Sequence, residues 1–260
     1  MDIWQETFPL RFGNIDRSDR LTLASPFDFV QEVAISHAEN LGVGREALAR
    51  LDQGWVLSRI SVFLERRPHW GETITVRSWP RGWDRLFAVR DYDIRDASGT
   101  PVVRGRSNWL ILDLKKRRPL RPQAVMETLP RNEGLDALPG GAGALDPREN
   151  PDTAGERQAR YSDIDYNGHV NNARYIQWIQ DTTEAELLET ADQMRLDINY
   201  LRELKNGETV TLLTAPLPRS GTQDMPDISA AMAYEGRHRE EGQAVFRAEL
   251  RVSGASRRET

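Results

Sequence analysis

The sequence contains no cysteine, which excludes disulfides, thiolate metal sites and a cysteine nucleophile. It also has no apolar run near the roughly 20 residues that a membrane helix needs, so no membrane partner is expected. The opening residues, MDIWQETFPLRF, have neither the basic region nor the apolar core of a secretory signal. We therefore expect a cytoplasmic protein.

Excess positive charge and the common cofactor motifs are absent as well. The net charge of −5 gives no global reason to expect a nucleic-acid partner. Only four histidines occur (His37, His69, His169, His238), and none has the HExxH spacing of a zinc site. Because the sequence also has no glycine-rich phosphate loop and no GxSxG elbow, we expect no cofactor, no metal and no common serine esterase.

The first half of the sequence alternates apolar and polar residues in several short segments. A helix is predicted from Pro26 to Leu41, with Gly42 as its stop. Residues 43–53 are expected to form a short helix or a loop. Strands are predicted at 1–12, 18–24, 55–64, 72–79, 85–95 and 101–113. A helix followed by such a meander indicates an α+β fold, in which the helix covers one face of an antiparallel sheet.

The second half repeats this plan. Residues 129–156 are rich in Pro, Gly and Asp and are typical of a linker. Beyond it we predict a helix at 170–189 and strands at 157–165, 194–204, 208–214, 228–235 and 243–252, with a frayed tail from Ser253. The segment Gly71–Val76 (GETITV) matches Gly207–Leu212 (GETVTL). This repeat predicts two copies of one domain, at 1–128 and 157–260.

Residues 161–181, YSDIDYNGHVNNARYIQWIQD, contain the densest group of polar side chains. Asp165, Asn167 and His169 alternate, so on an extended segment they would share one face just before a helix. A carboxylate, an amide and an imidazole form a plausible acid–base set, although turn and capping roles explain an Asp/Asn pair equally simply. The first copy, which has SPFDFVQEV at its helix, shows no comparable motif.

This stretch and four others resemble the acyl-acyl-carrier-protein thioesterases, the plant FatA/FatB class and its bacterial relatives. The others are RLTLASPFDFVQEVAISHAENLG, WVLSRISVFLERRPHWGETITVRSWP, RGRSNWLILDLKKRRPLR and INYLREL. The resemblance implies a double hotdog fold, in which each half wraps an antiparallel sheet around a long helix. It also implies hydrolysis of fatty acyl thioesters of acyl carrier protein, with the acyl chain in the N-terminal half and catalysis in the C-terminal half.

The family's catalytic residues can be carried over one by one. Its DxNxH motif falls on Asp165, Asn167 and His169, and its downstream acid falls on Glu203. The cysteine that follows this acid in plant members is Leu204 here, so a Cys–His mechanism is impossible. Asp165 would attack the carbonyl or activate water, Asn167 would orient it, His169 would carry the proton, and Glu203 would orient His169 or water. Covalent attack and general-base catalysis both remain open.

Two further features bear on substrate binding. A helix starting near Val170 would place free backbone N–H groups beside His169, where they can stabilise an oxyanion. A basic run is a candidate docking surface for the acidic carrier protein, although a solvated loop is an equally good interpretation. Its members are Lys115, Lys116, Arg117, Arg118 and Arg121.

Three alternatives stay open at this point. The thioester can be carried by coenzyme A instead of a carrier protein. The protein can be a hotdog dehydratase, which the DxNxHVNN pattern disfavours, or a non-catalytic acyl-binding protein, which would not need the Asp165, Asn167 and His169 set. Two fused hotdogs can satisfy their own pairing, so a monomer (a pseudo-dimer) and a homodimer are both compatible with the sequence.

Overall fold

The computed structural model describes residues 2–254 except 122 and 142. Residue 1 and residues 255–260, to which the expected domain limits extend, lie outside the described residues. Ser253 and Gly254, where fraying was expected to start, belong instead to the last strand. Within the described ranges no helix is both long enough and apolar enough to cross a membrane.

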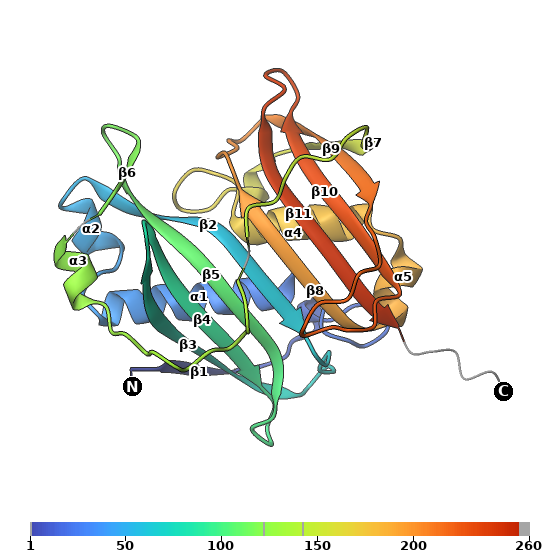
Figure 1. The fold of residues 1–260 in the computed structure, drawn as a ribbon, viewed down its shortest axis with the longest axis horizontal. Coiled ribbons are helices and arrows are strands. Elements are labelled where there is room, and N and C mark those ends of the chain that lie inside the picture. The colour runs from blue at the N-terminus through green and yellow to red at the C-terminus, as the bar shows by residue number, and fades with distance from the viewer. Residues whose placement is uncertain (1, 122, 142, 255–260) are drawn as a thin grey trace.

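One antiparallel sheet of eleven strands runs through the whole molecule (Figure 1). The first half contributes, in spatial order, β1 (Trp4–Pro9), β3 (Thr73–Asp84), β4 (Phe87–Arg95), β5 (Pro101–Asp113) and β2 (Gln53–Leu64). The second half continues with β8 (Ala191–Tyr200), β11 (Ala244–Gly254), β10 (Ala230–His238), β9 (Thr209–Pro216) and β7 (Asp152–Gln158). The short strand β6 (Arg118–Leu120) pairs only with β5.

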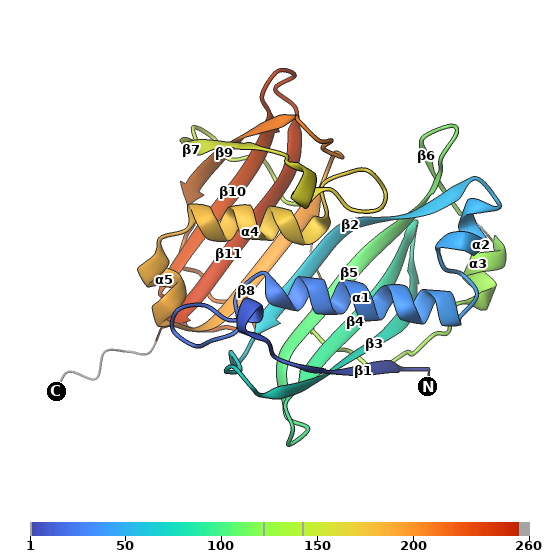
Figure 2. The ribbon, with the colours of Figure 1, turned by 180° about the vertical axis from the view of Figure 1, so that it is seen from behind.

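Two long helices, α1 (Ser25–Asn40) and α4 (Asn172–Thr182), lie across the same face of this sheet (Figure 2). Both bury an apolar stripe at helical spacing, which is Phe27, Val30, Val33 and Ala34 in α1 and Ala173, Ile176 and Ile179 in α4. Short helices α2 (Arg45–Ala49) and α5 (Ala185–Thr190) follow them, and α3 (Gln123–Thr128) follows β6.

The two halves meet where β2 pairs with β8. Ile60 lies opposite Ile198 and Val62 opposite Leu196, and all four side chains are buried in one shared core. The strand order on one side of this seam repeats on the other, from edge strands β1 and β7 inward. The fold is therefore the predicted double hotdog of the α+β class, with the sheets of the two copies joined into one.

The connection between the halves crosses the outer face of the sheet, opposite the helices (Figure 1). Ala137 donates its backbone N–H to the Asp91 carboxylate at 2.8 Å, and Leu138 is buried against Phe63 and Met225. Regular structure resumes at β7, so the strand predicted at 157–165 lies at 152–158 instead. The low periodicity of this segment reflects an extended chain fastened to the sheet by backbone hydrogen bonds.

Two other predicted elements were wrong. Residues 18–24 form no strand, because the Asp16 carboxylate accepts the backbone N–H groups of Ser18 and Arg20 and closes a tight loop. The helix predicted at 170–189 is divided into α4 and α5. It breaks because Thr183 takes an extended backbone conformation and donates its hydroxyl to the Ile179 carbonyl at 2.8 Å.

Candidate active site

Residues 164–170 form a closed loop, not the extended segment that the alternating polar residues predicted. The Asp165 backbone N–H donates to the His169 carbonyl at 2.9 Å, and the Gly168 N–H donates back to the Asp165 carbonyl at 3.0 Å. Gly168 has a φ of 81°, a value that side-chain-bearing residues rarely adopt. The Asn167 N–H donates to Oδ1 of Asp165 at 2.8 Å. Asp165 therefore closes the loop through hydrogen bonds of both its backbone and its carboxylate.

His169 and Glu203 come together as the sequence predicted. Nε2 of His169 lies 3.1 Å from Oε2 of Glu203, and their side chains are 28% and 37% exposed. Glu203 lies three residues beyond the end of β8, not within the predicted strand. The Val170 N–H donates to the Leu204 carbonyl at 2.8 Å and ties the loop to this segment. The pair is thus held by backbone hydrogen bonds and remains open to solvent.

Asp165 and Asn167 are placed by the same loop but make a different set of contacts. Within the described part of the chain, no hydrogen bond joins either side chain to His169. Asp165 is half-buried and Asn167 is exposed. The structure therefore supports His169 and Glu203 as a contacting pair, with Asp165 as a second carboxylate nearby.

Sequence analysis missed Tyr175, which lies on α4 behind this loop and is buried. Burial raises the pKa of its phenol, and the negative charges of Glu203 and Asp165 raise it further. The two carboxylates raise this pKa because both lie close to the buried Tyr175 hydroxyl. Tyr175 packs against Trp178 and Tyr200, with ring centroids 5.2 Å and 5.8 Å away, so aromatic contacts hold it in place.

The N-terminus of α4 differs from its expected position. The helix begins at Asn172, not near Val170, and the Asn171 side chain caps it by accepting the Ala173 N–H at 2.9 Å. The N–H groups of His169 and Asn172 have no acceptor among the residues that the structure describes. These two donors, not a complete free helix end, are the candidates for oxyanion stabilisation.

Arg117 is a further residue of the site, and it comes from the other half of the molecule. Its Nη2 lies 3.0 Å from Oε2 of Glu203, the same oxygen that faces His169. Arg117 occupies the turn between β5 and β6 and has a φ of 50°. The sequence alone placed Arg117 in the basic docking run. Its contact with Glu203 was not predicted, because that contact depends on how the two halves pair.

A second contact from the first half covers the loop. The guanidinium of Arg45, the first residue of α2, lies 3.6 Å from the ring centroid of Tyr166. Elsewhere in the basic run, Lys115 pairs with Asp52 at 2.5 Å and Lys116 lies 4.0 Å from Asp113. The site therefore lies between the second half's loop and the first half's α2 and β5–β6 turn.

The first half contains a structural counterpart of this loop, although its sequence does not show the motif. The Asp16 N–H donates to the Arg20 carbonyl at 2.8 Å, as the Asp165 N–H does to His169. Likewise, the Leu21 N–H donates to the Pro68 carbonyl at 2.8 Å, as the Val170 N–H does to Leu204.

In this counterpart Asp16 and Arg20 occupy the places of Asp165 and His169. Arg67, one residue before Pro68, corresponds to Glu203, and it forms an ion pair with Asp16. Its Nη1 also donates to the Leu188 carbonyl of α5 at 2.7 Å. The first copy of the loop thus joins the two halves through Arg67, while the second copy carries Asp165 and His169.

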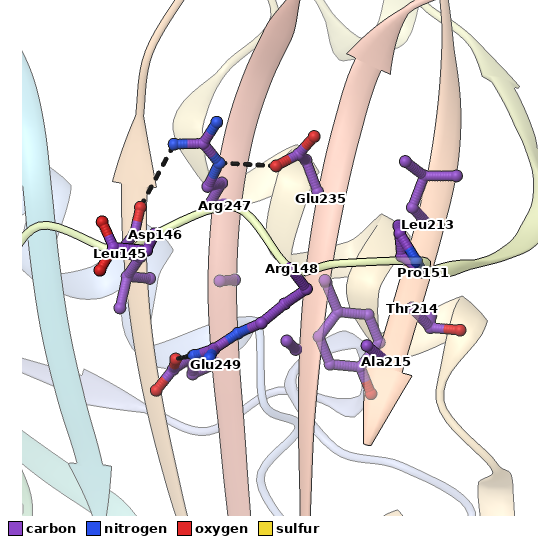
Figure 3. A pocket seen from close by; sticks show the side chains of 13 residues that line it. Leu145, Asp146, Arg148, Pro151, Leu213, Thr214, Ala215, Glu235, Arg247 and Glu249 are labelled. Atoms are coloured by element: carbon purple, nitrogen blue, oxygen red, sulfur yellow. Dashed lines mark hydrogen bonds and ion pairs between the residues drawn. The ribbon is translucent and has the colours of Figure 1, made fainter. Parts of the chain in front are cut away.

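Two hollows lie away from the loop. A partly open cavity lies between α1 and the sheet of the first half, and its wall includes Ile35, Trp55 and Trp109. Figure 3 shows the other, a seam beneath the connecting segment, where Arg247 contacts Glu235 at 2.6 Å. Neither is lined by the predicted catalytic residues, and no cluster of metal-binding side chains occurs in the described ranges.

Known proteins with this arrangement are acyl-ACP thioesterases. The family model of the acyl-ACP thioesterase N-terminal domain matches residues 1–127, and that of the C-terminal domain matches residues 148–258. A chloroplastic acyl-[acyl-carrier-protein] hydrolase, FATB2 of Cuphea viscosissima, is 28% identical over 234 residues, covering 83% of this chain and 56% of the relative. Oleoyl-acyl carrier protein thioesterase 2 of Arabidopsis thaliana is 26% identical, covering 81% of this chain and 62% of the relative.

Solved structures agree in fold. An acyl-ACP thioesterase from Bacteroides thetaiotaomicron superposes with a TM-score of 0.84 at 25% identity, covering 96% of this chain and 98% of that one. The 12:0-ACP thioesterase from Umbellularia californica gives a TM-score of 0.80 at 22% identity, covering 97% and 94%. The match of both family models, together with the shared double hotdog, places this chain in the acyl-ACP thioesterase family.

Proposed function

We propose that this protein hydrolyses the thioester between a fatty acyl chain and acyl carrier protein, releasing the free fatty acid. The observation that carries the proposal is the His169–Glu203 contact of 3.1 Å beside the Asp165 loop. Since the chain spans about 56–62% of the curated relatives named above, their substrates support the proposal by similarity alone.

The proposed chemistry follows from which imidazole nitrogen faces Glu203. Because Nε2 faces the carboxylate, that nitrogen carries the proton, and Nδ1 is left to accept a proton from water. Water then attacks the thioester carbonyl, the oxyanion is held by the N–H groups of His169 and Asn172, and the C–S bond breaks. The thiolate leaves with the proton from His169.

Asp165 has two possible roles in this scheme. It can position the attacking water, or it can attack the carbonyl itself and form a mixed anhydride that water then opens. Label in the Asp165 carboxylate after single-turnover hydrolysis in ¹⁸O-labelled water identifies the anhydride route with opening at the Asp165 carbonyl carbon. Opening at the acyl carbon, like direct attack by water, places the label in the fatty acid. Asn167, whose backbone N–H holds this carboxylate at 2.8 Å, keeps Asp165 oriented in either case.

The division of labour between the halves is part of the proposal. Residues 1–128 would hold the acyl chain, residues 157–260 would supply the catalytic groups, and residues 129–156 would link them. The largely apolar lining of the cavity in the first half supports this assignment. The chain is expected to act as a monomer, because β2 and β8 already pair within one molecule, and light scattering tests this against a homodimer.

The activity test compares one acyl group carried by acyl carrier protein and by coenzyme A. We expect hydrolysis of the carrier-protein substrate, and we expect Asp165→Ala and His169→Ala to abolish it with an unchanged circular dichroism spectrum. General acid–base groups contribute about 10²- to 10⁴-fold to such rates. Full activity in either variant contradicts the assignment, and faster turnover of the coenzyme A thioester identifies an acyl-CoA thioesterase instead.

The cytoplasmic location stays a prediction, which cell fractionation tests.

A further inference from the structure

The cavity of the first half has one charged residue in an otherwise apolar wall. Apolar side chains from α1 and the sheet form most of the lining, including Ile35, Ala38, Ala88 and Trp109. Arg90 of β4 also lines it and is only 8% exposed. Because a buried cation is costly unless it is paired, this position calls for a chemical explanation.

Arg90 forms no ion pair with a carboxylate of the described residues. Its Nη1 donates to Oγ of Ser78 at 2.9 Å and lies 3.1 Å from Nδ1 of His37. Its Nε and Nη2 make no hydrogen bond with any residue between 2 and 254 that the structure describes, yet neither is among the fully enclosed unpaired atoms. Two donors of a guanidinium that lines the cavity therefore have no partner in the described part of the chain.

The other buried arginines behave differently. Arg67 pairs with Asp16, and Arg195 lies 3.1 Å from Asp197 and 2.5 Å from Asp224. Both meet the ordinary requirement that a buried charge finds a counter-charge. Arg90 departs from this pattern, and it lines the cavity.

A chain of contacts behind Arg90 keeps it in place and leaves its charge available. Nε2 of His37 lies 3.4 Å from Oδ1 of Asp2. Burial lowers the pKa of His37, and the charge of Arg90 lowers it further, so the imidazole is neutral and its Nδ1 can accept from Arg90. The Arg90 guanidinium itself stays protonated.

We propose that Arg90 is a recognition point for an acyl chain that carries a hydrogen-bond-accepting oxygen. A hydroxyl or oxo group on the chain, or a carboxylate at its far end, would accept from Nε and Nη2 while the rest of the chain contacts the apolar wall. The inference rests on the proposed function, because it assumes that the cavity holds the acyl chain. It adds a preference for substituted chains over plain ones.

The test uses binding, so that it does not depend on hydrolysis. Methyl ester probes of one chain length are titrated against the fluorescence of Trp55 and Trp109, which line the cavity. They are a plain fatty acid methyl ester, esters with a hydroxyl or oxo group at successive positions, and a dicarboxylic acid monomethyl ester. We expect at least one oxygenated probe to bind roughly 10-fold more tightly than the plain ester, as a hydrogen bond to a charged group should give.

Variants assign any preference to the guanidinium. Arg90→Met should bind all the probes with equal affinity, and it should bind the plain ester as tightly as the wild type does. Arg90→Lys should retain part of the preference. Ile35→Val, which alters the same wall without removing a donor, should leave the preference unchanged. If Arg90→Met fails to fold by circular dichroism, the comparison of Arg90→Lys with Ile35→Val still tests the role of the fork of donors.

The outcomes separate this inference from the proposed function. Equal binding of all probes by the wild type, or a preference that persists in Arg90→Met, overturns it. Preference for the hydroxyl or oxo probes supports substituted chains, and preference for the dicarboxylate probe supports the same recognition point with a terminal carboxylate. If the wild type prefers an oxygenated probe but does not hydrolyse acyl-acyl carrier protein, only the proposed reaction is refuted.

Discussion

Arg117 and His169 contact the same oxygen of Glu203, from opposite halves of the molecule, at 3.0 Å and 3.1 Å. The carboxylate that is expected to orient the imidazole is therefore itself held by a cation from the first half. This relationship makes the candidate site a joint product of the two hotdogs. It also divides the basic run into one residue at the site and others that face solvent.

Replacing Arg117 should lower kcat more than it raises KM. We expect Arg117→Gln to reduce kcat by about 10-fold, because Glu203 loses a charge-assisted hydrogen bond that restricts its orientation. Arg117→Lys should recover part of the rate, and added guanidinium ions should partly rescue Arg117→Ala. An unchanged kcat in Arg117→Gln would show that the contact is only a surface ion pair.

Carrier-protein docking should depend on other residues of the same run. Lys115 and Arg117 have carboxylate partners, whereas Arg118 and Arg121 are exposed and have no ion pair within the described chain. Reversing both charges, as Arg118→Glu with Arg121→Glu, should raise KM several-fold and flatten its dependence on salt, since steering is screened by ions. Arg50→Glu on the neighbouring α2–β2 turn is the matched control for either single reversal, Arg118→Glu or Arg121→Glu, because each changes the net charge equally; an equal effect there would point to net charge instead of a docking surface.

The clasp formed by Asp16 and Arg67 should contribute strongly to stability. Arg67 is buried and donates to Asp16 and to the Leu21 and Leu188 carbonyls, and a hydrogen bond to a charged group contributes about 1.5–3 kcal/mol. We therefore expect Arg67→Met to lower the thermal unfolding midpoint markedly. Glu72→Gln, which weakens the half-exposed Arg66–Glu72 pair of 2.9 Å, should cost only about 0–1 kcal/mol. Similar midpoints for the two variants would contradict the role assigned to the clasp.

Acid should destabilise the protein through His37. Its folded-state pKa is lowered below the ordinary histidine value of about 6.5 by burial and by Arg90, so the unfolded chain binds the proton first as the pH falls. This contribution to stability is present above about pH 6.5 and is lost as the pH drops toward the lowered value.

Thermal unfolding between pH 8 and pH 5 measures this loss. His37→Gln should flatten the slope, because the amide cannot titrate, whereas His69→Gln at an exposed position should not change it. A slope that survives in His37→Gln would assign the acid sensitivity to other groups.

The sequence predicted the main elements of the fold because their side chains follow simple periods. Helix α1 was expected at 26–41 and lies at 25–40, and the repeated GETITV and GETVTL segments mark β3 and β9. Alternation is a local property, set by which face of a strand is buried, so it can be read without knowing the partner strand. Loops were harder, because backbone hydrogen bonds to carboxylates such as Asp16 leave no periodic pattern.

The sequence by itself determined that Asp165, Asn167 and His169 share one short segment, that Glu203 follows about 35 residues later, and that no thiol can take part. Only the tertiary structure decided which of these groups touch. In the folded protein Asp165 accepts the hydrogen bond that closes its own loop, and Arg117 of the first half contacts Glu203 of the second. In the first copy of the loop, Asp16 pairs with Arg67 instead. The physical reason is that the Arg117–Glu203 contact depends on the β2–β8 pairing, which sets the two halves side by side, whereas the two loops close through backbone hydrogen bonds that leave no periodic pattern in the sequence.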